Sequence, residues 1–268
     1  MGQNLFQLAY DCLIECRPEQ KMRLASELKQ ALEAGKLDIE PIDLPSVDRA
    51  GRPEKPELVA PRDVPKRKLG TVPGKAAAIH AFCHIEFNAI NLACDAVYRF
   101  RDMPEAFYAD WVQVAAEEAY HFSLLRERLQ QLGYDYGDFP AHNGLWELAQ
   151  KTAHDVLHRM ALVPRLMEAR GLDVTPAIQQ KFINVNDQQT ADILAIILRD
   201  EVGHVEAGSR WFRYLCQQRQ LDAEQTYFEL LEDYIKGEMR CPLHHQARLD
   251  AGFTRSELDR LEEMCARS

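Results

Sequence analysis

The chain has 268 residues, of which 46% are hydrophobic and 28% are charged. This is an ordinary globular composition, and the length allows one large domain or two small ones. The formal net charge of −10 disfavours a broad phosphate-binding surface, because nucleic-acid binding draws much of its affinity from Lys and Arg.

Seven cysteines are present, and none of them forms a C-x-x-C pair. An odd number without that motif argues against a disulfide framework or a structural zinc site, so we expect buried, reduced thiols. The first residues, MGQNLFQLAYDCLIEC, lack a basic leader, and no apolar run reaches the roughly 20 residues of a membrane span. These observations predict a cytoplasmic protein with no membrane partner.

The first 74 residues divide into a helical piece and a proline-rich arm. Residues 3–35 show helical spacing of apolar residues, interrupted near Pro18 and ending at Gly35. Residues 36–74 hold seven of the chain's 13 prolines, which block helix interiors and central strands. This stretch is either a linker or an arm wrapped over the bundle, and the apolar residues spaced through it favour the wrapped arm.

From Lys75 onward the pattern is helical almost throughout, and we see no convincing strand. Long helices are predicted at about 75–100, from Pro104 to before Gly133, at about 145–170 with a stop at Gly171, and at about 187–218. Thr175-Pro176 is expected to open a short helix. Within the third pattern, 145–153 could be a separate short helix, so that the true helix starts near Asp155. Two short helices are predicted after 218, the last opening with a Thr254/Glu257 capping box.

Two of these helices carry the same motif, a glutamate followed three residues later by a histidine. The motifs are Glu118-Ala-Tyr-His121 and Glu201-Val-Gly-His204. Residues i and i+3 lie on one helix face, so one metal ion can take an oxygen and a nitrogen from the same helix. Both motifs lie on apolar faces, where an unpaired carboxylate is costly and a divalent cation would compensate it.

The other two helices each carry a lone inward carboxylate, Glu86 and Glu168. Glu86 precedes Glu118 by 32 residues (118 − 86), and Glu168 precedes Glu201 by 33 (201 − 168). Two hairpins with matched arms place the four carboxylates at one depth, and a longer link of 50 residues (168 − 118) fits a crossover. This is the ligand order of ferritin-like di-iron and di-manganese bundles.

Long stretches of the chain also resemble an uncharacterised, domain-of-unknown-function family of the ferritin-like superfamily. They are HIEFNAINLACDAVYRFRDMP, EEAYHFSLL, YGDFPAHNGLWE, VPRLMEARGLDVTP and DEVGHVEAGSRWF, from roughly Gly51 to Phe253. The resemblance implies a ferritin-like fold and a dinuclear site at Glu86, Glu118, His121, Glu168, Glu201 and His204. More distantly, the chain is similar to the tRNA isopentenyladenosine hydroxylases, which share the bundle and the ligand order.

We therefore predict an all-α, ferritin-like four-helix bundle with an N-terminal helical extension, the arm and short C-terminal helices. The arm and N-terminal helices (1–74) would pack on a di-metal domain (75–268). The ligand set suits two iron ions, with manganese as the alternative. The expected function is a dinuclear oxidase or oxygenase whose partners are dioxygen and a small-molecule substrate, in a homodimer. A tRNA-modifying hydroxylase, and iron storage or peroxide detoxification, are the alternatives.

Two further acidic residues are predicted to support the site. Glu117 and Asp200 each immediately precede a ligand glutamate, and a metal-bound histidine generally donates its other N–H to a carboxylate or carbonyl. Because the histidine ring of the same motif points away toward the metal, we expect a crossed arrangement, in which Asp200 accepts from His121 and Glu117 from His204. The Cys241-Pro-Leu-His-His245 tract is interpreted as a loop rather than a second metal site.

Overall fold

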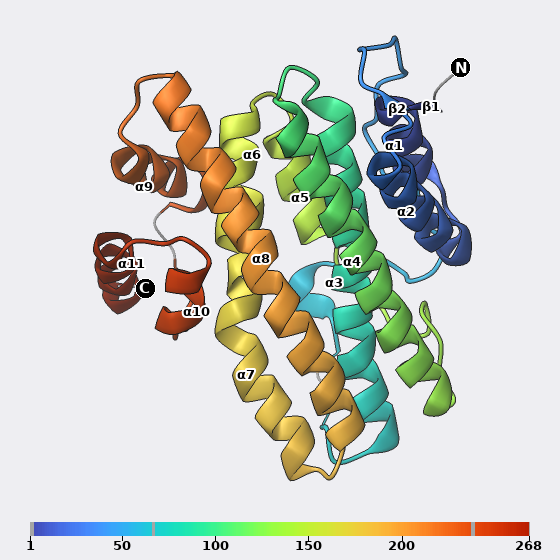
Figure 1. Cartoon of the computed structure of the whole chain (residues 1–268). Helices are drawn as coiled ribbons and strands as arrows, with labels where there is room; N and C mark the ends of the chain where they lie inside the picture. Colours follow the sequence, from blue (N-terminus) through green and yellow to red (C-terminus); the bar gives the residue numbers. More distant parts are fainter. Residues whose placement is uncertain (1–2, 66–67, 237–238, 268) are drawn as a thin grey trace. The chain divides into compact units, whose positions relative to one another are not determined.

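The computed structural model describes residues 3–65, 68–236 and 239–267 (Figure 1). These residues are helical apart from loops and two strands of two residues each, so the predicted all-α class is confirmed. The chain divides into two compact units, Met1–Gln150 and Lys151–Ser268, which are described separately below. The ferritin-like arrangement of four helices stays a prediction, and so does the proposed domain boundary after residue 74, which lies inside the first unit.

The first unit is built around a hairpin of two long helices. Helix α3 packs along α4, while α1 covers α3 and α2 covers α4. Two short strands, β1 and β2, pair in parallel. The elements are β1 (Gln3–Asn4), α1 (Leu5–Ile14), α2 (Pro18–Glu33), β2 (Leu37–Asp38), the 3-10 turn η1 (Pro61–Asp63), α3 (Val72–Arg99), α4 (Glu105–Gln131) and α5 (Gly144–Lys151).

Helix α3 begins at Val72, slightly before the expected start near Lys75, and α4 begins at Glu105, directly after Pro104. The Thr71 side chain accepts the N–H of Gly74 at 3.1 Å and caps α3, and Pro104 stands at the N-cap of α4. Their apolar faces are buried along most of their length; examples are Ile79, Ile90 and Val97 on α3, and Trp111, Val114, Leu125 and Leu129 on α4. Side chains in the middle of the two facing helices are therefore buried in the interface between α3 and α4.

The proline-rich arm contacts α1 and α5 within the first unit, in the part that the structure describes; residues 66–67 lie outside that part. The Gly51 N–H donates to the carbonyl of Leu13 at 2.8 Å, and the Trp146 indole donates to the carbonyl of Asp48 at 3.2 Å. A Cβ on Gly51 would lie 2.1 Å from the carbonyl oxygen of Ile14. The arm therefore approaches α1 more closely than any side chain at that position would allow.

The second unit is a second helix hairpin with a C-terminal helical cover. Helix α8 packs against α6, the π-helical turn η2 and α7, while α9 covers α6 and α8, and α10 contacts α7 and α8. The elements are α6 (Val156–Leu162), η2 (Val163–Glu168), α7 (Ala169–Asn184), α8 (Gln188–Gln218), α9 (Ala223–Ile235), α10 (His245–Asp250) and α11 (Arg255–Arg267).

The third helical pattern proves to contain several elements. A separate short helix, α5, is followed by α6, whose N-cap Asp155 accepts the N–H of Leu157 at 2.8 Å, so the alternative start near Asp155 is confirmed. The predicted stop at Gly171 and the new helix at Thr175-Pro176 are wrong. Helix α7 runs through Gly171 and holds Pro176 in its interior, because packing against α8 outweighs the local preference of both residues.

The expectation that all thiols are reduced and buried is also wrong. Cys241 and Cys265 form a disulfide, and Cys16 is exposed. The remaining free thiols, on Cys12, Cys83, Cys94 and Cys216, are buried. Sequence spacing does not show that a loop and a helix end meet, which is why this pair was missed.

A candidate metal centre in two half-sites

The first unit brings together three of the six predicted ligands. Glu86 lies in the middle of α3, and Glu118 and His121 lie one turn apart on the facing side of α4. All three side chains are buried, with exposed fractions of 2%, 0% and 0%. The hairpin of α3 and α4 thus places two carboxylates and an imidazole in an interior that is otherwise largely apolar.

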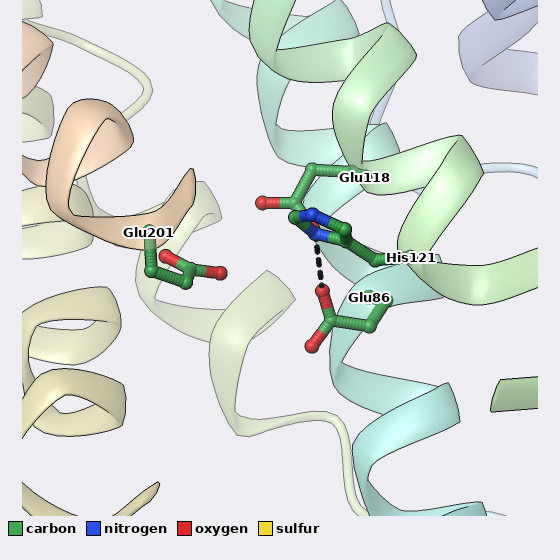
Figure 2. A group of neighbouring side chains, drawn as sticks. All are labelled: Glu86, Glu118, His121 and Glu201. Carbon is green, nitrogen blue, oxygen red and sulfur yellow. Dashed lines mark ion pairs between the residues drawn. The ribbon is translucent and has the colours of Figure 1, made fainter. Parts of the chain in front are cut away.

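The geometry of this group converges on one nitrogen. His121 Nδ1 lies 3.3 Å from Oε2 of Glu86 and 3.5 Å from Oε2 of Glu118, and the three residues offer ligand atoms within 4.8 Å of one another. Figure 2 shows Glu86 on α3 and the two α4 residues, with the contact between Glu86 and His121 dashed. His121 Nδ1 is therefore the ring atom positioned to bind the same metal ion as the two carboxylates.

The pKa values of Glu86 and His121 are both shifted, because their charges are buried close to one another and to Glu118. Burial, followed by the like charge of Glu118, raises the pKa of Glu86 to about 8. Burial alone would lower the pKa of His121, but Glu118 and Glu86 outweigh it and raise that pKa to about 11. Two buried carboxylates at this distance need positive charge between them. A divalent cation supplies that charge without a proton.

The second unit holds the other three predicted ligands. Glu201 and His204 are buried one turn apart on α8, and His204 Nδ1 lies 3.7 Å from Oε2 of Glu201. Figure 2 labels Glu201 on this helix. Glu168 is half-buried at the last position of the π-helical turn η2. π-helical turns are rare and occur frequently at functional sites, so this irregular turn adds to the case for Glu168.

The donor chemistry fits a first-row metal ion. Each unit offers two carboxylates and one imidazole, and such hard oxygen and borderline nitrogen donors suit iron or manganese. In the first unit, Oε2 of Glu86 is buried and faces His121 Nδ1 at 3.3 Å. This buried cluster of carboxylates and imidazole can hold a metal ion.

The predicted supporting residues have local partners within their own units. Gln113 donates to Oε1 of Glu117 at 2.6 Å, and Arg199 donates to Oδ1 of Asp200 at 2.7 Å. The crossed pairing with His204 and His121 would join residues of different units. It stays a prediction.

Sequence reasoning missed the polar cluster that follows Glu168 along the chain. Arg170 and Asp173 lie on the first turns of α7, and Arg248 is buried and donates to both carboxylate oxygens of Asp173, at 2.9 and 2.8 Å. The predicted stop at Gly171 hid the fact that Arg170 and Asp173 lie one turn apart on a single helix. Nothing in the sequence showed that Arg248, 75 residues later, would meet them.

The fold and the candidate site together define an all-helical protein with buried Glu-x-x-His motifs. The chain belongs to the family described as a protein of unknown function, DUF455, whose model matches residues 14–259. It is similar to an uncharacterized protein of Haemophilus influenzae, at 48% identity over 272 residues, covering 97% of this chain and 94% of that protein. No solved structure matches. Among the described residues, no helix combines the length and apolarity needed to cross a membrane.

Proposed function

We propose that the chain is a non-haem dinuclear metal protein in which the two units contribute one half-site each to a single centre. Each half-site combines a lone glutamate with a Glu-x-x-His pair, the ligand order of ferritin-like carboxylate proteins. The observation that carries the proposal is the buried group of Glu86, Glu118 and His121, which brings two carboxylates and an imidazole within 4.8 Å of one another. The second half-site repeats the same residue types on α8 and η2.

The metals are proposed to be two iron ions, with manganese as the alternative. When bound and reduced, such a pair supplies electrons to dioxygen for the oxidation of an organic substrate. His121 and His204 would bind through Nδ1, the atom that faces a carboxylate in each half-site. Glu86 and Glu168 would complete the coordination, and the surrounding apolar side chains exclude bulk water. The proposed activity is that of an oxidase or oxygenase.

Metal analysis tests the proposed centre. Protein purified from its own source should contain two metal ions per chain, and Glu118→Gln and Glu201→Gln should each lose most of them. Glutamine keeps the size of the side chain and removes its charge. The matched control is Glu127→Gln, an exposed position on α4, which should keep full occupancy. Full occupancy in both ligand variants would refute the assignment.

Oxygen consumption tests the proposed chemistry. Reduced, iron-loaded protein exposed to air should consume oxygen and develop the absorption of an oxidised di-iron site. Zinc as the native metal, with no oxygen uptake, would favour a two-metal hydrolase instead.

Two further measurements separate the alternatives. A large cage in light scattering would favour iron storage, whereas a monomer or dimer would disfavour it. Salt-sensitive binding to tRNA would favour the modifying hydroxylase.

A further inference from the structure

The Cys241–Cys265 disulfide joins a loop to the last turns of a helix in the second unit. Cys241 lies in the loop before α10, Cys265 lies in α11, and their Cα atoms are 5.9 Å apart with a sequence separation of 24. Cys241 is exposed and Cys265 is half-buried. A thiol in solution can therefore reach the bond, as thiol–disulfide exchange requires.

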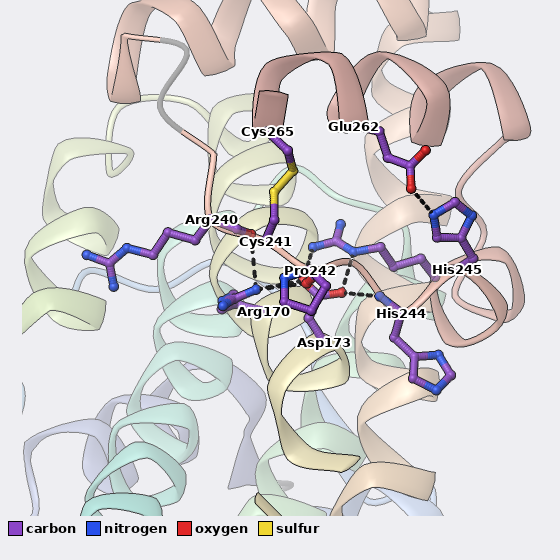
Figure 3. The surroundings of a disulfide bond; sticks show 10 residues. Arg170, Asp173, Arg240, Cys241, Pro242, His244, His245, Glu262 and Cys265 are labelled. Carbon is purple, nitrogen blue, oxygen red and sulfur yellow. Dashed lines mark hydrogen bonds and ion pairs between the residues drawn. A yellow bond between two sulfur atoms is a disulfide. The ribbon is translucent and has the colours of Figure 1, made fainter. Parts of the chain in front are cut away.

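The loop on either side of Cys241 holds the guanidinium of Arg170. Arg170 donates to the carbonyls of Arg240 and Pro242, at 3.0 and 3.1 Å. Figure 3 shows Arg170 with the loop residues Arg240 and Pro242, beside the disulfide. The two carbonyls can bind one guanidinium only while the loop keeps its shape. The disulfide is the covalent bond that fixes this stretch of the loop to α11.

The same loop is attached to α7 at a second residue, one turn along the helix. Asp173 accepts the backbone N–H of His244 at 2.8 Å and forms the buried pair with Arg248. Arg170 also lies 3.6 Å from Asp173. The contacts from Arg240 to Arg248 thus converge on the first two turns of α7 (Figure 3), and Glu168 immediately precedes that helix.

We propose that Cys241–Cys265 is a redox-sensitive clasp that holds the first turns of α7, and with them Glu168, in place. In the oxidised form the clasp fixes the loop that binds Arg170. A dithiol reductant opens it: one thiolate attacks a sulfur of the bond, the second thiol resolves the mixed disulfide, and two cysteine thiols and an oxidised reductant result. Opening releases the loop from α11 and loosens its hold on α7.

Hydrogen exchange on the metal-free, full-length chain tests the clasp. The oxidised protein should show five free thiols, because seven cysteines less the disulfide pair leaves five. After treatment with dithiothreitol, the amides of residues 169–175 should exchange about 10-fold faster, while those of α3 and α4 stay unchanged, as expected for local opening. Cys241→Ser and Cys265→Ser should each reproduce this change without reductant.

Two variants make the test specific. Cys16→Ser removes the exposed free thiol and should leave the response to dithiothreitol intact. Arg170→Gln should exchange faster at residues 169–175 when oxidised and gain little more on reduction, because its contact with the loop is already lost. Seven free thiols in the untreated protein, unchanged exchange after reduction, or faster exchange throughout both units would each overturn the proposal.

The consequence for metal binding rests on the proposed function and has its own readout. Reduction, or Cys265→Ser, should speed the loss of bound manganese to a chelator, because Glu168 is less firmly held. If no manganese binds to either redox form, the dinuclear centre fails while the exchange result still decides the clasp. If manganese binds and its loss is the same in both forms, the link to Glu168 is wrong.

Discussion

At the scale of single residues, the two carboxylate oxygens of Glu257 bind different partners in the second unit. One oxygen accepts the N–H of Thr254 at 2.8 Å, which completes the predicted capping box. The other oxygen accepts from the guanidinium of Arg165 at 2.6 Å. That guanidinium is buried, and its central carbon lies 4.2 Å from the centre of the Tyr227 ring. Removing the charge of Glu257 leaves a buried cation without its counter-ion.

Glu257→Gln should therefore lower the free energy of unfolding by about 3–5 kcal/mol, the usual cost of breaking a buried pair. Glutamine can still act in the capping box, so the loss reports the charge rather than the cap. The control is Glu224→Gln, whose partner Arg260 is 44% exposed, and which should cost less than about 1 kcal/mol. Urea denaturation of both variants measures the difference, and equal losses would contradict the argument.

His80 is one of two buried histidines in the first unit, with His84, that should make stability depend on pH. It is buried, and its Nε2 accepts the N–H of Gly137 at 3.0 Å, which only a neutral ring can do. Burial lowers the pKa of His80 to about 4, against a small opposing effect of Asp138. Because the unfolded state binds the proton first, the contribution of His80 is complete above about pH 6.5 and is lost as the pH falls toward 4.

His80→Gln should flatten this dependence, since glutamine can accept the same hydrogen bond and does not titrate. The free energy of unfolding of the wild type should fall more than that of the variant between pH 7 and pH 4.5, by up to about 3 kcal/mol. His154→Gln, at an exposed position, should follow the wild type. If His80→Gln shows the full loss on acidification, the histidine is not the responsible group.

At the scale of elements, the π-helical turn η2 depends on a glycine of α8. A Cβ built on Gly208 would lie 2.3 Å from Cγ and 2.4 Å from Cβ of Pro164. The proline ring is rigid, so α8 and η2 would have to move apart. Gly208→Ala should cost about 1–3 kcal/mol of stability through overpacking and should displace Glu168 at the end of the turn.

The control for this substitution is Gly171→Ala in α7, where a Cβ meets nothing within 4 Å. Alanine there should stabilise the helix by about 0.5–1 kcal/mol, the ordinary difference in helix propensity. Thermal unfolding of the two variants, compared with the wild type, separates crowding from propensity. Stabilisation by both substitutions would show that η2 tolerates a wider separation from α8.

The elements also show where sequence patterns succeed and fail. Helices α3, α4 and α8 lie close to their predicted limits because a long apolar face marked each one. A helix end at Gly171 and a new helix at Thr175-Pro176 were predicted because glycine often ends a helix and proline often opens one, whereas here α7 packs on α8 and runs through both residues. The residues around Gly171 and Pro176 do not show in the sequence that α7 packs on α8.

At the scale of the whole molecule, the candidate ligands could be predicted because their pattern repeats along the chain. Glu86, Glu118 and His121 indeed converge within the first unit, and Glu201 lies beside His204 in the second. The contacts between Cys241 and Cys265, and between Asp173 and Arg248, could not be predicted, since they join segments without any shared periodicity. The union of the two half-sites remains the central prediction for the molecule.

Metal should couple the unfolding of the two units if both half-sites bind the same pair of ions. Metal-free protein is expected to unfold in two calorimetric transitions, one for each compact unit. An ion pair held by both units binds only when both are folded, so saturating metal should merge the transitions and stabilise the protein by about 4 kcal/mol at 1,000 times the dissociation constant. Manganese is the suitable probe because it avoids oxidation by air during heating.

Ligand variants from each unit make this test specific. Glu118→Gln in the first unit and Glu201→Gln in the second should both keep two transitions in the presence of manganese, because either change breaks the shared centre. Glu127→Gln should merge them as the wild type does. If manganese raises only one transition, and a ligand variant in the other unit leaves that rise intact, then each unit binds metal by itself and the shared centre is wrong.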